Sequence, residues 1–254
     1  MKLAISGKGG TGKTTLAALL AKFWAEQGKD IIAVDADPDA NLAGALGVPA
    51  KTTITPISEM RQFILDRTGA KEGYGSYFKL NPKVDDIPER FSYRLDGIRL
   101  LVLGGAATGG AGCICPESAL LKALVTHLLL TPKQIVILDM EAGVEHLGRA
   151  TAAAVSTMIV VAEPGQRSIQ TALNVQRLAR QIGINKVAAV INKLTEGLDL
   201  DSLTALLGDV PIVGTLPYDP AIAEADLKGQ SCWLDTTAQR QYIAKIAQTL
   251  LAEG

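Results

Sequence analysis

The sequence predicts an α/β fold in which a mostly parallel sheet is covered by helices on both faces. Two observations lead to this prediction: short, continuously apolar runs recur along the chain, and stretches with helical periodicity lie between them. Strands that are apolar without alternation are typical of parallel sheets, because both faces of such a sheet are buried. The expected strands are 2–6, 30–35, 98–103, 134–138, 158–162, 187–191 and 211–216.

Helical periodicity is clearest directly after the first expected strand. From Lys13 onward, apolar residues recur three and four positions apart as far as Trp24, and Gly28 provides a stop. Two later stretches, 175–182 and 243–251, also keep one apolar face. We expect a helix in each, so that strands and helices alternate along the chain.

The chain is expected to form a single domain, 1–254, with one insertion. Residues 49–97 differ from the rest because they hold most of the tyrosines and many charges, with no strong strand pattern. We interpret them as helices and loops at one rim of the sheet.

Composition excludes several function classes. Lys and Arg number 25 against 26 Asp and Glu, so the net charge of −1 is less basic than is usual for a protein that binds nucleic acid through phosphate contacts. No apolar run is long enough to span a membrane, and the N-terminus lacks the pattern of a signal peptide. The three cysteines, 113, 115 and 232, are too few and odd in number for a disulfide framework. We therefore expect a cytoplasmic protein with no nucleic-acid or membrane partner.

A phosphate-binding motif follows the first strand. The run 7–14 fits the pattern G-x-x-x-x-G-K-[ST], in which glycines let backbone N–H groups curl around phosphate oxygens. Lys13 is expected to reach the β- and γ-phosphates of a nucleotide, and the Thr14 hydroxyl to bind Mg²⁺. The alternative is a glycine-rich turn without a ligand. The expected phosphate-binding residues are Gly7, Lys8, Gly9, Gly10, Thr11, Gly12, Lys13, Thr14 and Thr15.

Acidic residues end two further strands. Asp35 and Asp37 follow the second strand, and Asp139 follows four apolar residues, as in a Walker B motif. Carboxylates at the carboxyl ends of parallel strands face the ligand crevice of such a sheet. Asp139 is expected to hold a water on Mg²⁺. The alternatives are a turn-forming Asp-Pro pair for Asp37 and a helix N-cap for Asp139.

The base of the nucleotide is predicted from the end of a later strand. Asn192 and Lys193 lie where P-loop folds read the base, and Thr195 takes the position at which GTPases place an acid. An amide both donates and accepts hydrogen bonds, which suits adenine. The sequence therefore favours ATP over GTP.

Two of the cysteines could bind a metal ion. Cys113 and Cys115 are one residue apart, so together they leave a tetrahedral ion two ligands short. A second copy of the chain across a two-fold axis would supply the missing pair, and thiolates suit Zn²⁺, Ni²⁺ or Cu(I). The alternative is two ordinary thiols in a turn.

Lys8, a second lysine inside the phosphate loop, gives the chain a family resemblance. Over nearly its whole length the chain resembles the deviant Walker A ATPases, the group of ParA, MinD and the nitrogenase iron protein. The resemblance implies that Lys8 reaches across a dimer interface and that Asp37 polarises the attacking water. It places Asp35 nearer the Mg²⁺ shell, Gly143 N–H at the γ-phosphate and Pro217 beside the base. The expected catalytic residues are Lys8, Lys13, Asp37 and Asp139.

The run after Asp139 narrows the resemblance. Met140 and Glu141 depart from the Thr-Pro-Ala-Gly of partition proteins, and Glu-His-Leu-Gly-Arg follows at 145–149. With the C-x-C pair, this run is similar to the CooC-type nickel-maturation ATPases of carbon monoxide dehydrogenase. That resemblance implies a homodimer that uses ATP to assist nickel insertion into the Ni–Fe–S centre, with Ni²⁺ or Zn²⁺ on Cys113 and Cys115. The alternatives are a maturation ATPase for another nickel enzyme, such as acetyl-CoA synthase, and a ParA- or MinD-like positioning ATPase.

Overall fold

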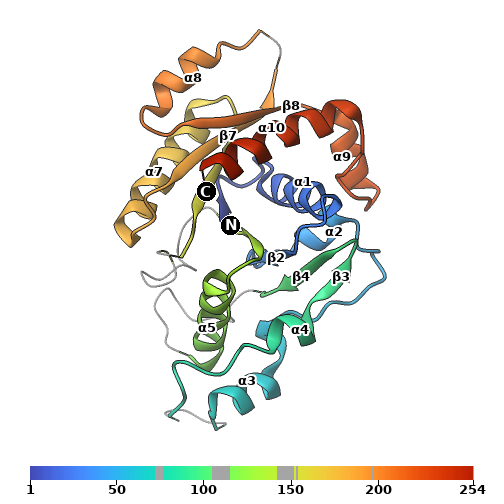
Figure 1. Cartoon of the computed structure of the whole chain (residues 1–254), viewed down its shortest axis with the longest axis vertical. Helices are drawn as coiled ribbons and strands as arrows, with labels where there is room; N and C mark the ends of the chain where they lie inside the picture. Colours follow the sequence, from blue (N-terminus) through green and yellow to red (C-terminus); the bar gives the residue numbers. More distant parts are fainter. Residues whose placement is uncertain (72–76, 105–114, 142–151, 153, 196, 254) are drawn as a thin grey trace.

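A single mixed sheet forms the centre of the computed structural model (Figure 1), which describes residues 1–254 except 72–76, 105–114, 142–151, 153, 196 and 254. Its strand order is β3-β4-β2-β5-β1-β6-β7-β8. Every neighbouring pair is parallel except β3 with β4. The strands are β1 Lys2–Ser6, β2 Ile31–Asp35, β3 Tyr93–Leu95, β4 Ile98–Val102, β5 Ile135–Asp139, β6 Thr157–Ala162, β7 Val187–Leu194 and β8 Ile212–Pro217.

The seven strands expected from the sequence are all present, with ends that differ by up to three residues. The strand β3 was not expected, so the prediction that 49–97 lacks a strand is wrong in this part. Asp96 and Gly97 both have positive φ, 48° and 80°, and they join β3 to β4 in a tight hairpin. An Asp-Gly pair flanked by alternating apolar residues is a strong hairpin signal, because few other residues tolerate two successive positive φ values.

Helices cover both faces of the sheet, as the sequence predicts. One hydrophobic core contains apolar side chains of α3, α5, α7 and α8, and the other contains those of α1, α2 and α10. Among the described residues, no helix has the length and apolar character needed to cross a membrane. The helices are α1 Lys13–Glu26, α2 Leu42–Leu46, α3 Arg61–Thr68, α4 Ile87–Phe91, α5 Pro116–Leu130, α7 Gln166–Ile182, α8 Leu200–Leu207, α9 Pro220–Leu227 and α10 Thr237–Glu253, with a 3₁₀ turn at Ile57–Glu59.

The central strands bring the polar residues of the sequence motifs to one edge of the sheet. β1 lies between β5 and β6, and β2 pairs with β5 in a register that sets Asp35 beside Asp139. The loop that joins β1 to α1 leaves from the same edge. The carboxyl ends of these strands therefore surround one crevice, which is where open α/β sheets bind ligands.

Candidate functional site

The phosphate loop has backbone conformations that require glycine. Gly7, Gly10 and Gly12 have φ values of 145°, 80° and 91°. A Cβ on Gly7 would lie 2.3 Å from the carbonyl oxygen of Val161, and one on Gly12 would lie 2.2 Å from Nδ2 of Asn192. The loop is therefore packed tightly against β6 and β7, and a side chain at either position would force it away from them.

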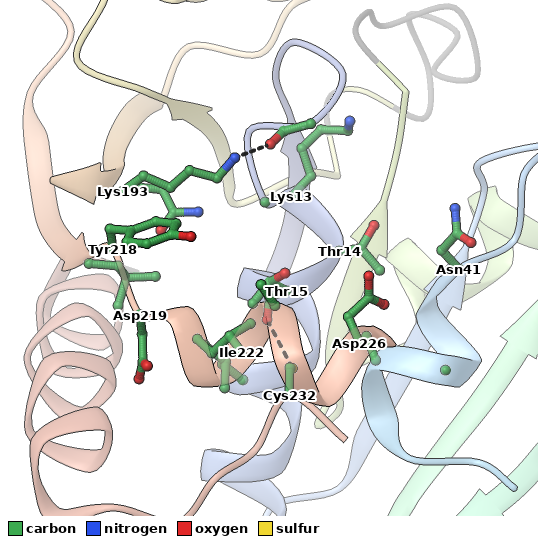
Figure 2. Close-up of a pocket in the computed structure, with 18 of the residues that line it drawn as sticks. Lys13, Thr14, Thr15, Asn41, Lys193, Tyr218, Asp219, Ile222, Asp226 and Cys232 are labelled. Atoms are coloured by element: carbon green, nitrogen blue, oxygen red, sulfur yellow. Dashed lines mark hydrogen bonds between the residues drawn. The ribbon is translucent and has the colours of Figure 1, made fainter. Parts of the chain in front are cut away.

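A cavity of about 810 Å³ opens beside this loop (Figure 2). Its walls come from the phosphate loop, the segment after β2, the ends of β7 and β8, and the segments around α9 and α10. The sequence-predicted residues that line it are Gly9, Gly10, Gly12, Lys13, Thr14, Thr15, Asp37, Asn192, Lys193 and Pro217. A cavity of this size at the start of a helix that follows a glycine loop is suited to a nucleotide.

Asp139, at the end of β5, is buried beside the phosphate loop. It is 1% exposed, and neither carboxylate oxygen has a hydrogen-bond partner among the described residues. Burial raises the pKa of Asp139 to about 7, while the nearby Thr14 hydroxyl and Lys13 ammonium act in the opposite direction. Two unpartnered carboxylate oxygens next to a hydroxyl form the hard-oxygen set that Mg²⁺ prefers. The residues present therefore fit a magnesium ion held between Thr14 and Asp139.

Asp35, at the end of β2, has different surroundings. Its two oxygens accept hydrogen bonds from the backbone N–H groups of Leu42 (2.8 Å) and Asp37 (3.3 Å). Burial raises the pKa of Asp35 to about 6, and these two N–H groups counteract the rise. Asp37 itself is half-buried and lines the cavity. Asp35 thus holds the loop that carries Asp37.

Asn192 and Lys193 both contact the phosphate loop. Asn192 Nδ2 donates to the carbonyl oxygen of Thr11 at 2.8 Å. Lys193 Nζ donates to that of Gly10 at 2.7 Å (Figure 2). Lys193 Nζ also pairs with Glu163 Oε1 at 2.6 Å. These contacts support the loop. Whether Asn192 and Lys193 also read the base stays a prediction.

Several cavity residues were not singled out from the sequence. Tyr218, Asp226, Gln239 and Tyr242 line the wall formed by α9 and α10. Cys232 is 5% exposed and lines the same cavity, and its burial raises the pKa of the thiol to about 12. Only the fold brings these residues to the phosphate loop, more than 200 positions earlier in the chain, so no local spacing could have indicated them.

The remaining predicted residues lie away from the cavity or outside the described residues. Lys8 is exposed and does not line the cavity. Cys115 is half-buried at the start of α5, where its Sγ accepts a hydrogen bond from the N–H of Ser118 at 3.4 Å. Cys113 and Gly143 lie outside the described residues, so the structure does not test the C-x-C pair or the γ-phosphate contact. In the described part of the chain no three His, Cys, Asp or Glu side chains form a metal cluster.

Comparison with known proteins identifies the family. Residues 2–232 match the model of the CobQ/CobB/MinD/ParA nucleotide binding domain. The chain belongs to this family. It is therefore an ATP-binding P-loop ATPase, and the resemblance drawn from Lys8 and the phosphate loop is confirmed.

Comparison with individual proteins narrows the assignment of the chain within this family. It is 46% identical to the carbon monoxide dehydrogenase accessory protein CooC of Rhodospirillum rubrum, over 92% of this chain and 89% of that protein. It is 41% identical to an uncharacterized ATP-binding protein of Methanocaldococcus jannaschii, over 98% of this chain and 100% of that protein. The chain is thus CooC-like.

Solved structures agree on the fold. The MinD protein in the MinC:MinD cell division complex of Aquifex aeolicus superposes with a TM-score of 0.71 at 19% identity, covering 100% of this chain and 97% of that one. A Pyrococcus horikoshii MinD complexed with Mg-ADP superposes with a TM-score of 0.67 at 20% identity, covering 97% and 94%. At these identities the likeness shows a common fold and no more.

Proposed function

We propose that this chain is a homodimeric, ATP-hydrolysing metallochaperone that assists nickel insertion into the Ni–Fe–S centre of carbon monoxide dehydrogenase. The observation that carries this proposal is the 46% identity to the Rhodospirillum rubrum accessory protein over 92% of the chain. The phosphate loop, the unpartnered Asp139 and the C-x-C pair support it. The proposed site of action is the cytoplasm, with no nucleic-acid or membrane partner.

ATP hydrolysis in this proposal depends on Lys13, Thr14 and Asp37, which line the cavity, and on Asp139, which is buried beside the phosphate loop. Lys13 would neutralise charge on the β- and γ-phosphates, and Thr14 with Asp139 would hold Mg²⁺. When bound, Mg²⁺ offsets the negative charge that spreads over the phosphate oxygens. Asp37, half-buried at the cavity wall, orients the water that attacks the γ-phosphate, so that ATP and water give ADP and phosphate.

In this proposal, Lys8 makes ATP hydrolysis depend on formation of the dimer. Its side chain is exposed and does not line the cavity of its own chain, so it is available to a partner copy. A cation supplied by the partner would complete charge neutralisation only in the dimer. Lys8→Ala should therefore bind ATP as the wild type does but lose the ATP-induced part of dimerisation in sedimentation experiments. Dimerisation with ATP as strong as in the wild type would refute this role.

The cysteine pair is the proposed nickel-handling site. Cys115 lies at the start of α5 with its Sγ half-buried, and Cys113 precedes it by two positions. Two copies of the pair across a two-fold axis would give four sulfur ligands to one ion. Here nickel is the substrate that is delivered, and zinc is the competing ion.

Metal stoichiometry tests the proposal directly. Nickel or zinc should bind at one ion per dimer to the wild type, and Cys113→Ser/Cys115→Ser should lose this binding while keeping ATPase activity. Cys232→Ser is the matched control, because it removes the third cysteine and should leave the stoichiometry at one. A double variant that still holds one tight ion per dimer would contradict the metal site.

The client enzyme is tested by activation. Purified chain, ATP and nickel should raise the activity of nickel-free carbon monoxide dehydrogenase, and Lys13→Ala should not. Activation of nickel-free acetyl-CoA synthase alone would establish the other nickel enzyme as the client instead.

A further inference from the structure

The segment between α9 and α10, residues 228–236, packs against α2, and we call it the strap. The backbone N–H of Cys232 and the hydroxyl of Ser231 both donate to the carbonyl oxygen of Ala45, at 3.0 and 3.2 Å. Gly47, which ends α2, approaches the strap so closely that a Cβ there would lie 2.8 Å from Cβ of Ser231. The strap and α2 therefore form one close contact more than 180 positions apart in sequence.

The strap is also fixed on its other side. The side chain of Gln239, 7% exposed on α10, donates through Nε2 to the carbonyl oxygen of Cys232 at 2.9 Å. Trp233 Nε1 donates to Oε1 of Glu26, at the end of α1, at 3.1 Å, and the Arg240 guanidinium lies 5.1 Å from the Trp233 ring centre. Because the strap is also held to α1 and α10, it restricts the position that α2 can take.

α2 connects this support to the loop that carries Asp37. At its start, the N–H of Leu42 donates to Asp35 Oδ2, and the other oxygen of Asp35 accepts the N–H of Asp37. α2 spans only Leu42–Leu46, so its two ends are separated by little more than one helical turn. A displacement at Gly47 therefore reaches the Asp35 carboxylate without any flexible segment between.

Both ends of this connection border the same cavity. Cys232 lines it on the strap side, where its Sγ lies 3.8 Å from the carbonyl oxygen of Thr15 (Figure 2), and Asp37 lines it on the α2 side. A nucleotide in the cavity thus meets the strap and Asp37 at once.

We infer that the strap positions Asp37 for hydrolysis through α2, with Ser231 and Gly47 as positioning residues. The inference rests on the proposed role of Asp37 in ATP hydrolysis. It adds that the strap contributes to the catalytic rate, because the strap determines where α2, and with it the Asp37 loop, is held.

Gly47→Ala is the test, since the added methyl group acts as a wedge between α2 and the strap. Gly69→Ala is the matched control: Gly69 ends α3 with φ of 71°, close to the 89° of Gly47, but a Cβ there meets nothing within 4 Å. Both variants bear similar backbone strain, and only one pushes on the strap. We expect single-turnover ATP hydrolysis to fall about tenfold in Gly47→Ala and less than about twofold in Gly69→Ala, with ATP affinity within about threefold of the wild type in both.

A double-mutant cycle shows whether the wedge acts through Asp37. Asp37→Ala should be slow by itself, and adding Gly47→Ala should slow it further by less than about twofold. An equal tenfold loss in both backgrounds, or equal rates for Gly47→Ala and Gly69→Ala, would overturn the inference. If Asp37→Ala keeps the wild-type rate, the proposed role of Asp37 in hydrolysis is wrong, and the inference fails with it. If Asp37→Ala is slow but the loss caused by Gly47→Ala is the same in both backgrounds, only the inference fails.

Ser231→Ala provides a gentler variant if the wedge prevents folding. It deletes the hydroxyl that donates to Ala45 and that accepts the N–H of Trp233 at 3.1 Å, and leaves the Cys232 contact in place. We expect single-turnover hydrolysis to fall about threefold with unchanged ATP affinity, and this loss to vanish in the Asp37→Ala background. A loss of affinity with an unchanged rate would overturn the inference.

Discussion

The carboxyl ends of β2 and β5 each place a buried aspartate at the crevice, and the two side chains differ in what they contact. Asp35 and Asp139 are register partners on adjacent strands and are 0% and 1% exposed. Asp35 accepts two backbone N–H groups, whereas the oxygens of Asp139 have no partner among the described residues. Asp35 and Asp139 are therefore buried to the same extent on adjacent strands, but among the described residues only the Asp35 carboxylate has hydrogen-bond partners.

This difference indicates separate roles: Asp35 holds the backbone of the site in place, and Asp139 is available to bind a cation. Burial raises the pKa of both carboxyls, to about 6 for Asp35 and about 7 for Asp139, because each is removed from water. The N–H groups beside Asp35 recover part of that cost within the protein. For Asp139 the larger part of the cost remains, and a divalent cation is the partner that would offset it.

The largest expected effect is on catalysis and comes from Asp139. Asp139→Asn should lower the rate of Mg²⁺-dependent ATP hydrolysis by about a thousandfold, because several kcal/mol of charge stabilisation is lost at the phosphates. Asp201→Asn, at an exposed position on α8, is the control and should keep the wild-type rate. Steady-state phosphate release measures both. A rate within tenfold of the wild type would show that Asp139 does not act on the cation.

The second prediction concerns stability: the substitution Asp139→Asn, which should lower the catalytic rate, should raise the free energy of unfolding at neutral pH. Because the folded pKa of Asp139 lies near 7 and its ordinary value is 3.8, the folded protein keeps a proton that the unfolded chain releases. The contribution of Asp139 to the free energy of unfolding of the nucleotide- and metal-free protein should therefore fall as pH rises from about 4 to about 7. Asp139→Asn removes this contribution, so it should be close to the wild type near pH 4 and exceed it by about 4 kcal/mol at pH 8.

Urea unfolding at several pH values measures this difference. Asp35→Asn is the matched comparison and should gain less at pH 8, because the substitution also disturbs the hydrogen bonds from Leu42 and Asp37. Parallel pH profiles for the wild type and Asp139→Asn would show that the carboxylate is solvated in solution.

The contrast also shows what sequence could and could not predict. The strands, the helices on both faces and the phosphate loop follow from local patterns: apolar runs, helical periodicity and obligatory glycines. The β3–β4 hairpin had a local signal in Asp96-Gly97, which the lack of a strong strand pattern obscured. By contrast, Asp35 and Asp139 look alike in sequence, since each ends an apolar strand. Their difference depends on α2, whose first N–H reaches Asp35.

Long-range packing limits sequence prediction in the same way at the far wall of the cavity. Cys232, Gln239 and Tyr242 reach the phosphate loop only because β8 lies at the opposite side of the sheet from β2 and the chain then returns through α9 and α10. No spacing between these residues and Lys13 encodes that return.

The third prediction asks whether Asp35 belongs to the magnesium site, as the family resemblance implies, or to the α2 loop, as its contacts indicate. Asp35→Asn should slow ATP hydrolysis about tenfold by loosening the Asp37 loop, with the Mg²⁺ concentration for half-maximal rate unchanged. The measurement is the rate as a function of Mg²⁺ at saturating ATP. A several-fold rise in the Mg²⁺ requirement would place Asp35 at the cation instead.

The smallest expected effect is the response of the nucleotide-free protein to Mg²⁺ alone. A ligand that binds only the folded state stabilises it by RT ln(1 + [L]/Kd), which is about 0.4 kcal/mol when the concentration equals Kd. For a chain of this size that corresponds to a rise in Tm of about 1 °C. The rise should appear in the wild type and in Asp35→Asn at pH 8, and not in Asp139→Asn, with NaCl of matched ionic strength as the control. It should shrink at pH 6, because a proton then competes with the cation for the Asp139 carboxylate, whose pKa lies near 7. A Tm rise of the same size in Asp139→Asn would mean that the cation binds elsewhere, and the distinction between the two aspartates would then reduce to their hydrogen bonds.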